Sequence, residues 1–217
     1  MTEGEAQSTP SMPVWQPQVG ACYGNGWERM WKHFLELLLI FIVYFLLILP
    51  GAIPYVGWVY SFLVSGPLAY GVAYALLRAA RGEPVKIDNM FAAFSNYWNA
   101  VLAYLLTAVI VIIGIILLIV PGIIFACRLA FTPYLIVERK MEAIEAIKTS
   151  WRMTRGHAGT VFLVGLLGIP IAIAGMICLG VGLIPASMWI GLALASLYHS
   201  VASQEQNVIK ESSVHPS

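Results

Sequence analysis

Six long apolar segments alternate with short polar stretches along this 217-residue chain. A helix that crosses the hydrocarbon of a membrane needs about 20 apolar residues, with a range of roughly 17 to 25. The segments that meet this requirement cover residues 33–49, 53–77, 99–120, 122–137, 160–179 and 183–202, and the fourth is the shortest. The pattern predicts an all-α polytopic membrane protein with six transmembrane helices.

The connections inside each successive pair of segments carry no charge. They read LPGAIPYVG after the first segment, VPG after the third and LGVGLIP after the fifth. Proline lacks the amide donor of a helix and glycine accepts left-handed dihedral angles, so both residues favour a turn. We therefore expect three helical hairpins, and we expect the second hairpin to turn at Pro121–Gly122.

Basic residues mark the other ends of the predicted hairpins. Of the twelve lysines and arginines, eleven lie before the first segment, between hairpins or after the last segment, and none lies at a tip. Positive charge is retained in cytoplasmic loops. We therefore expect a multi-pass protein of the cell's inner (plasma) membrane with both termini in the cytoplasm.

Three blocks that enter the hairpins resemble one another. They are WERMWKHFLELLL, FSNYWNAVLAYLL and WRMTRGHAGTVFL, and aligning them puts Trp27, Phe94 and Trp151 in one column. A parallel threefold repeat explains this alignment, and independent aromatic belts at the membrane interface are the alternative. Either way, we expect the following residues to be membrane-interface anchors: Trp27, Trp31, Phe91, Phe94, Trp98 and Trp151.

The segments that precede the second and third hairpins are amphipathic. Apolar side chains recur at helical spacing in residues 86–98 and 140–153. We expect cytoplasmic amphipathic connector helices that rest in the headgroup layer, with binding of a protein partner as the alternative. The remaining polar stretches, residues 1–26 and 203–217, are expected to be disordered cytoplasmic tails around a membrane domain of residues 27–202.

Composition supports membrane insertion and argues against nucleic-acid binding. Hydrophobic residues make up 59% of the chain and charged residues only 11%, whereas soluble domains carry roughly 25% charged residues. The mean hydropathy is +0.80. A net charge of +1 argues against nucleic-acid binding, because neutralising phosphates requires a basic patch.

No known catalytic, metal-binding or cofactor-binding motif is present in the sequence, and no pair of carboxylates lies within the apolar segments. We therefore expect no cofactor and a non-enzymatic role as a structural, lipid-associated or partner-binding membrane component. Membrane lipids, a protein partner or a second copy are the expected partners. The alternative is a small-solute transporter or permease subunit, which would need polar groups that converge at mid-membrane.

Arg128 is the exception among the basic residues, because it lies inside the fourth segment. It follows Gly122 by six residues, or about 9 Å along a helix. An intramembrane arginine suggests a function, and a lipid phosphate or another anion is a candidate ligand. Hydrogen bonds to tip carbonyls or to tyrosine and threonine hydroxyls are the structural alternative, which we favour from sequence alone.

Three stretches resemble a large family of uncharacterised prokaryotic multi-pass membrane proteins, which is akin to the membrane domain of some glycerophosphodiester phosphodiesterases. They are GPLAYGVAYALLRAARGEPVKIDNMFAAF, LLIVPGIIFACRLAFTPYLIVE and EAIKTSWRMTRGH. The resemblance implies a six-span helical domain of unknown role, and the phosphodiesterase chemistry belongs to a soluble domain that these stretches do not resemble. The matching positions are Arg81, Gly82, Glu83, Pro121, Gly122, Arg128, Pro133, Ala146, Ser150, Trp151 and Gly156.

Overall fold

The computed structural model describes residues 18–52, 56–177 and 182–214, and the regular elements of this part of the chain are all helices. In chain order they are α1 (Val19–Lys32), α2 (Phe34–Ile48), η1 (Leu49–Ala52), α3 (Val56–Arg81), η2 (Ile87–Asn96), α4 (Tyr97–Leu117), α5 (Ile119–Leu129), α6 (Thr132–Glu138), α7 (Ala143–Met153), α8 (Ala158–Ile177) and α9 (Leu183–Val214). The two elements labelled η are 3-10 helices.

Six stretches of the described residues are long and apolar enough to cross a membrane. They are Phe34–Gly51, Leu63–Arg81, Ile87–Leu117, Val120–Glu138, Ala158–Ile177 and Leu183–Gln206. Each overlaps one of the six predicted segments. The all-helical class and the number of candidate spans are therefore confirmed, and they are compatible with a multi-pass membrane protein.

The second stretch of each successive pair is the more deeply buried one. Between 44% and 61% of each apolar stretch in α3, α5–α6 and α9 is buried, against 11% to 22% in α2, α4 and α8. Consecutive helices also pack on each other, α2 on α3, α4 on α5 and α8 on α9. The protein therefore has three inner stretches, each accompanied by a more exposed outer helix.

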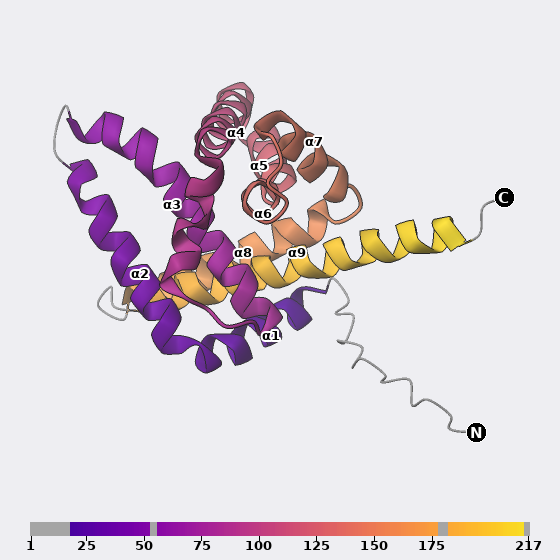
Figure 1. Ribbon diagram of the computed structural model, residues 1–217, viewed down its shortest axis with the longest axis horizontal. Coiled ribbons are helices and arrows are strands. Elements are labelled where there is room, and N and C mark those ends of the chain that lie inside the picture. The colour runs from indigo at the N-terminus through magenta and orange to yellow at the C-terminus, as the bar shows by residue number, and fades with distance from the viewer. Residues whose placement is uncertain (1–17, 53–55, 178–181, 215–217) are drawn as a thin grey trace, which may run out of the picture.

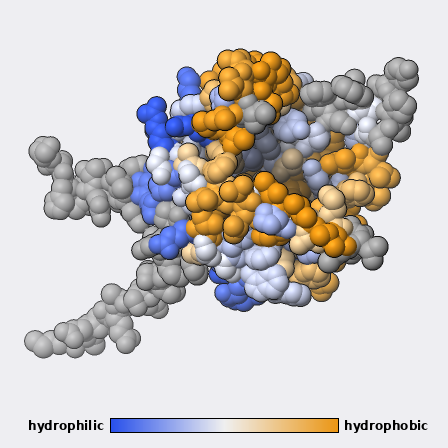
Figure 2. Space-filling view, turned by 180° about the vertical axis from the view of Figure 1, so that it is seen from behind, coloured by the Kyte–Doolittle hydropathy of each residue, from blue (hydrophilic) through white to orange (hydrophobic). Residues whose placement is uncertain are grey.

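The start of α1 and the end of α9 lie on one side of the molecule, whereas the end of α2 and the start of α9 lie on the opposite side (Figure 1). Hydrophilic residues gather on the side where α1 begins, and hydrophobic residues cover most of the rest of the same face (Figure 2). On the face shown, this distribution is compatible with a polar end that meets water and an apolar surface that meets lipid.

The N-terminal tail is predicted to end at residue 26, but residues 19–26 form the first part of α1 and pack against the inner helices. The side chain of Asn25 donates hydrogen bonds to Ser196 Oγ (2.8 Å) and to the Ala80 carbonyl (3.3 Å). The Tyr23 hydroxyl donates to the Val164 carbonyl (2.8 Å). The C-terminal boundary also differs, since α9 continues through residues 203–214. Residues 1–17 lie outside the described part.

The turn between α4 and α5 is shifted from the predicted Pro121–Gly122 to Leu118, which is extended (φ −167°, ψ 146°). Pro121 lies in the first turn of α5, where its missing N–H would have no partner anyway. Gly122 packs so closely on α4 that an added Cβ would lie 2.7 Å from the Ile115 nitrogen. The Pro-Gly pair thus starts the returning helix and lets it approach its neighbour.

The two segments predicted to be amphipathic connectors contain the helices η2 and α7, and their place in the headgroup layer stays a prediction. Residues 87–96 form a 3-10 helix in which Met90 is buried while Phe91 and Phe94 are exposed. The main chain of η2 lies directly on Gly71 of α3, where a Cβ would overlap the Met90 carbonyl. In α7 the buried side chains are small or polar except for Met153: Ala143, Ala146, Thr149, Ser150 and Met153. Close backbone packing therefore positions these elements, and Phe91, Phe94 and Ile144 remain exposed.

Candidate functional site

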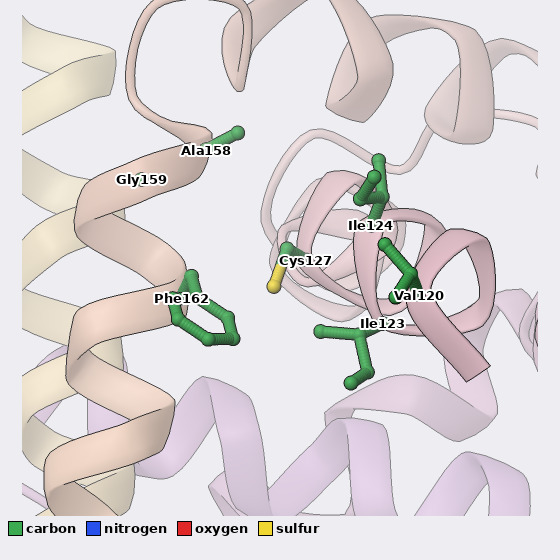
Figure 3. A pocket seen from close by; sticks show the side chains of 7 residues that line it. All are labelled: Val120, Ile123, Ile124, Cys127, Ala158, Gly159 and Phe162. Atoms are coloured by element: carbon green, nitrogen blue, oxygen red, sulfur yellow. The ribbon is translucent and has the colours of Figure 1, made fainter.

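A groove separates α5 from α8, and its lining is almost wholly apolar. Its volume is about 350 Å³, which lies at the lower end of the range of small-molecule sites, about 300–1,000 Å³. The α5 side consists of Val120, Ile123, Ile124 and Cys127, and the α8 side of Ala158, Gly159 and Phe162. The ring of Phe162 points across the groove toward Ile123 and Cys127 (Figure 3). Because α8 is one of the outer helices, the groove belongs to the apolar surface and suits a hydrocarbon chain.

Arg128 flanks this groove. It follows Cys127 directly and lies one helical turn after Ile124, so its side chain leaves α5 at the edge of the groove-lining face. The guanidinium carbon lies 4.8 Å from the centre of the Trp151 ring, which is a cation–π contact. Trp151 itself packs on Phe125, with ring centroids 5.7 Å apart. The structure thus brings together two residues that the sequence singled out separately.

The nearby hydroxyls of Ser150 and Thr154 bond to the main chain of Arg128 and not to its guanidinium. The Ser150 hydroxyl donates to the Arg128 carbonyl (2.8 Å), and the Thr154 hydroxyl lies 3.2 Å from the same oxygen. Within the described residues the guanidinium makes no ion pair with a carboxylate, and its ring contact is with Trp151. Its N–H donors therefore remain available for an oxygen ligand.

A helix break next to Arg128 explains why Ser150 lies there. Pro133 cannot continue a helix through the carbonyl of Leu129, four residues earlier, so α5 ends at Leu129 and α6 begins at Thr132. The buried Ser150 hydroxyl bridges this break, since it accepts a hydrogen bond from the Phe131 N–H (3.3 Å) and donates one to the Arg128 carbonyl. This bridge holds α7, and with it Trp151, against the end of α5.

A second polar cluster ties the inner stretches together. Glu138 at the end of α6 forms an ion pair with Arg81 at the end of α3, and the Tyr198 hydroxyl of α9 donates to Glu138 Oε2 (2.6 Å). Both charged side chains are only about one-fifth exposed, at 20% and 21%. Because these groups satisfy one another, the cluster is a structural joint between three segments of the chain.

The Arg81-Gly82-Glu83 motif contributes to this joint. Gly82 ends α3 in the left-handed region (φ 77°), and the Glu83 N–H then donates to the Arg78 carbonyl (2.9 Å). This turn brings the Glu83 carboxylate to Arg78 Nε (3.0 Å). Each residue of the motif therefore has a structural role at the end of α3.

The predicted interface anchors fall into two groups. Trp27, Trp31, Phe91, Phe94 and Trp98 are exposed, with Trp98 at 76%, and their contact with a membrane interface stays a prediction. Trp151 is only partly exposed because it covers Phe125 and Arg128. Among the described residues, no group of three or more His, Cys, Asp or Glu side chains is placed to hold a metal ion.

The α5–α8 groove and the cluster of Arg81, Glu138 and Tyr198 could not be predicted from the sequence, because each combines residues from distant segments. Glu138 and Tyr198 are 60 positions apart, and neither stands out locally. A signal for α1 was present, since Cys22, Gly26 and Met30 recur at four-residue spacing and lie on its buried face. The low helix propensity of its three glycines obscured this pattern.

Comparison with known proteins identifies relatives of unknown role. Uncharacterized protein Rv2560 of Mycobacterium tuberculosis and Uncharacterized protein Mb2590 of Mycobacterium bovis are each 26% identical to this chain over 149 residues. The match covers 69% of this chain but only 44% of each relative. No solved structure matches, and these relatives show no link to glycerophosphodiester phosphodiesterases. Residues 55–209 match the model of a domain of unknown function, DUF7847. The chain therefore belongs to the DUF7847 family.

Proposed function

We propose that this chain is a non-enzymatic, lipid-associated component of the prokaryotic inner membrane, and that it holds a lipid acyl chain in the α5–α8 groove. The apolar groove itself is the observation that carries the proposal. A groove on the lipid-facing surface of a membrane protein faces acyl chains. These chains are already out of water, so close packing in the groove supplies the gain on binding.

The proposed topology has three hairpins with both termini in the cytoplasm. The contacts of α2 with α3, α4 with α5 and α8 with α9 support the hairpins. The charge asymmetry of the sequence supports the orientation. Single cysteines that replace the exposed Leu118 or Leu183 should react with an impermeant thiol reagent from outside intact cells, and one that replaces the exposed Glu142 should not. Labelling of the Glu142 position from outside would contradict this topology.

Two glycines of α8 offer a matched test of lipid binding. Gly159 lines the groove, whereas Gly165 does not, and an ideal Cβ at either position would meet nothing within 4 Å. Gly159→Leu fills the groove, and Gly165→Leu places the same side chain on the same helix outside it. Both substitutions should be tolerated, because leucine favours a helix over glycine by up to about 1 kcal/mol.

The measurement is the amount of lipid per protein after purification in mild detergent, determined by mass spectrometry. We expect Gly159→Leu to retain several-fold less lipid than the wild type and Gly165→Leu to retain the same amount. Equal lipid in all three proteins, each folded to the same helix content, would contradict the proposed function.

A further inference from the structure

We propose that the occupant of the α5–α8 groove is an anionic glycerophospholipid of the cytoplasmic leaflet, whose phosphate is bound by Arg128. This inference rests on the proposed function and adds the class of headgroup. The acyl chain would lie along Val120, Ile123 and Cys127, and the phosphate would lie at the end of the groove beside Arg128.

The first support is the state of the Arg128 side chain. A guanidinium carries five N–H donors in one plane, and contact of its face with an aromatic ring leaves the donors at its edge free. Trp151 supplies that ring at 4.8 Å, while no described carboxylate pairs with the charge. A cation within an apolar segment is costly unless an oxygen ligand accompanies it, and a phosphate accepts two parallel N–H bonds from a guanidinium.

The second support is that this cation is held in place. Ser150 bridges the main chain on both sides of the α5–α6 break, so the helix that carries Trp151 is fixed relative to Arg128. Phe125 supports the Trp151 ring from α5 itself. A site fixed in this way loses little conformational entropy when a ligand binds.

The third support is charge complementarity. Residues 139–157, which surround Trp151 in sequence, hold five basic residues and two acidic ones. Glu205 lies within 4 Å of two of the basic residues, Arg139 and Arg152, at 3.7 and 3.8 Å. Lys148 and Arg155 lie three residues before and four residues after Trp151, and neither has an ion pair within the described residues. This excess of positive charge favours a headgroup with a net negative charge over a zwitterionic one that carries its own ammonium.

The experiment compares two lipids with identical acyl chains, phosphatidylglycerol and phosphatidylethanolamine, titrated into the delipidated full chain and followed by native mass spectrometry. We expect the wild type to bind phosphatidylglycerol on the order of tenfold more tightly, because the guanidinium and the local positive charge both act on its headgroup. Arg128→Gln should remove most of this preference but leave binding through the groove. Arg128→Lys should keep an intermediate preference, since lysine retains the charge and loses the planar fork.

Lys86→Gln is the matched control, because it removes the same amount of charge from the exposed residue before η2. It should leave the headgroup preference unchanged. An unchanged preference in Arg128→Gln would overturn the inference, and so would an equal loss in Lys86→Gln. Should Arg128→Gln fail to fold, Arg128→Lys decides the question, because an undiminished preference in that variant contradicts binding by the guanidinium fork.

The results for Arg128 and Gly159 distinguish a wrong headgroup assignment from a wrong proposed function. If Arg128 has no effect on headgroup preference while Gly159→Leu still lowers the binding of both lipids, the headgroup assignment is wrong and the proposed function stands. If Gly159→Leu binds both lipids as the wild type does, the groove holds no lipid and both proposals are wrong.

Discussion

The hydroxyl of Tyr198 donates a 2.6 Å hydrogen bond to Glu138 Oε2, and the other carboxylate oxygen of Glu138 is paired with Arg81. These residues come from α9, α6 and α3, so the bond links the three buried stretches of the fold at one point. The Tyr198 ring also stacks on Tyr134, with centroids 4.8 Å apart. These contacts therefore join the three inner stretches at one point.

Removing the Tyr198 hydroxyl should weaken this joint. A hydrogen bond to a charged group contributes about 1.5–3 kcal/mol, so Tyr198→Phe should lower stability by that order, measured by unfolding in a mixed-detergent titration. Tyr97→Phe is the matched control, because its hydroxyl donates a longer bond (3.2 Å) to the neutral Leu63 carbonyl at an exposed position. Equal destabilisation by the two substitutions would show that the joint contributes nothing beyond an ordinary hydrogen bond.

Ser150→Ala should destabilise the α5–α6 break. The substitution leaves the Phe131 N–H and the Arg128 carbonyl without the hydroxyl that bridges them, and an unsatisfied buried group costs about 1–3 kcal/mol. The same unfolding measurement tests this expectation. Ser187→Ala removes an exposed hydroxyl that bonds only within its own helix, so it should change stability by less than about 0.5 kcal/mol. Ser150→Ala at wild-type stability would mean that the bridge is dispensable.

Gly122→Ala should disturb the contact between α4 and α5. A Cβ at this position would lie 2.7 Å from the Ile115 nitrogen and 2.9 Å from its Cα. These are main-chain atoms, which cannot move aside as the end of a flexible side chain can. Overpacking of this kind costs about 1–3 kcal/mol. Gly165→Ala, where a Cβ meets open space, should be neutral or stabilising in the same mixed-detergent unfolding titration. A neutral Gly122→Ala would contradict the close approach of the two helices.

The six apolar stretches and the all-helical class could be predicted because a spanning helix is encoded locally, by length and hydrophobicity. The packing of Asn25 on Ser196 could not, since it joins residues 171 positions apart. Trp151 illustrates the same limit within the site. Its place on an amphipathic helix indicates an interface anchor, and only the tertiary contact with Phe125 and Arg128 shows that the ring covers a cation.

The burial of α1 predicts a weakly reactive thiol at Cys22. Desolvation raises the pKa of this thiol from 9.0 to about 11, because burial disfavours the charged thiolate. In a variant with Cys127 and Cys178 replaced by alanine, alkylation of Cys22 at pH 8 should be at least tenfold slower than that of a cysteine at the exposed Ser95.

The raised pKa also sets the direction of the pH dependence. The unfolded chain loses the Cys22 proton near pH 9 and the folded chain only near pH 11, so the contribution of this buried thiol to stability is complete below pH 9 and is lost as the pH rises toward 11. Cys22 alkylation at the rate of the Ser95 cysteine at pH 8 would show that the packing of α1 on the inner helices does not bury this residue.

Photo-crosslinking in native membranes tests the central claim, that the α5–α8 groove holds a lipid chain, most directly. A phospholipid with a diazirine on its acyl chain is incorporated into the membrane and activated by light. Peptide mass spectrometry then identifies the residues that it has crosslinked. We expect crosslinks to concentrate in residues 120–127 and 158–162, and to decrease there in Gly159→Leu but not in Gly165→Leu. Crosslinks spread over the exposed faces of α2, α4 and α8 in proportion to their exposure, and unchanged by Gly159→Leu, would contradict the account.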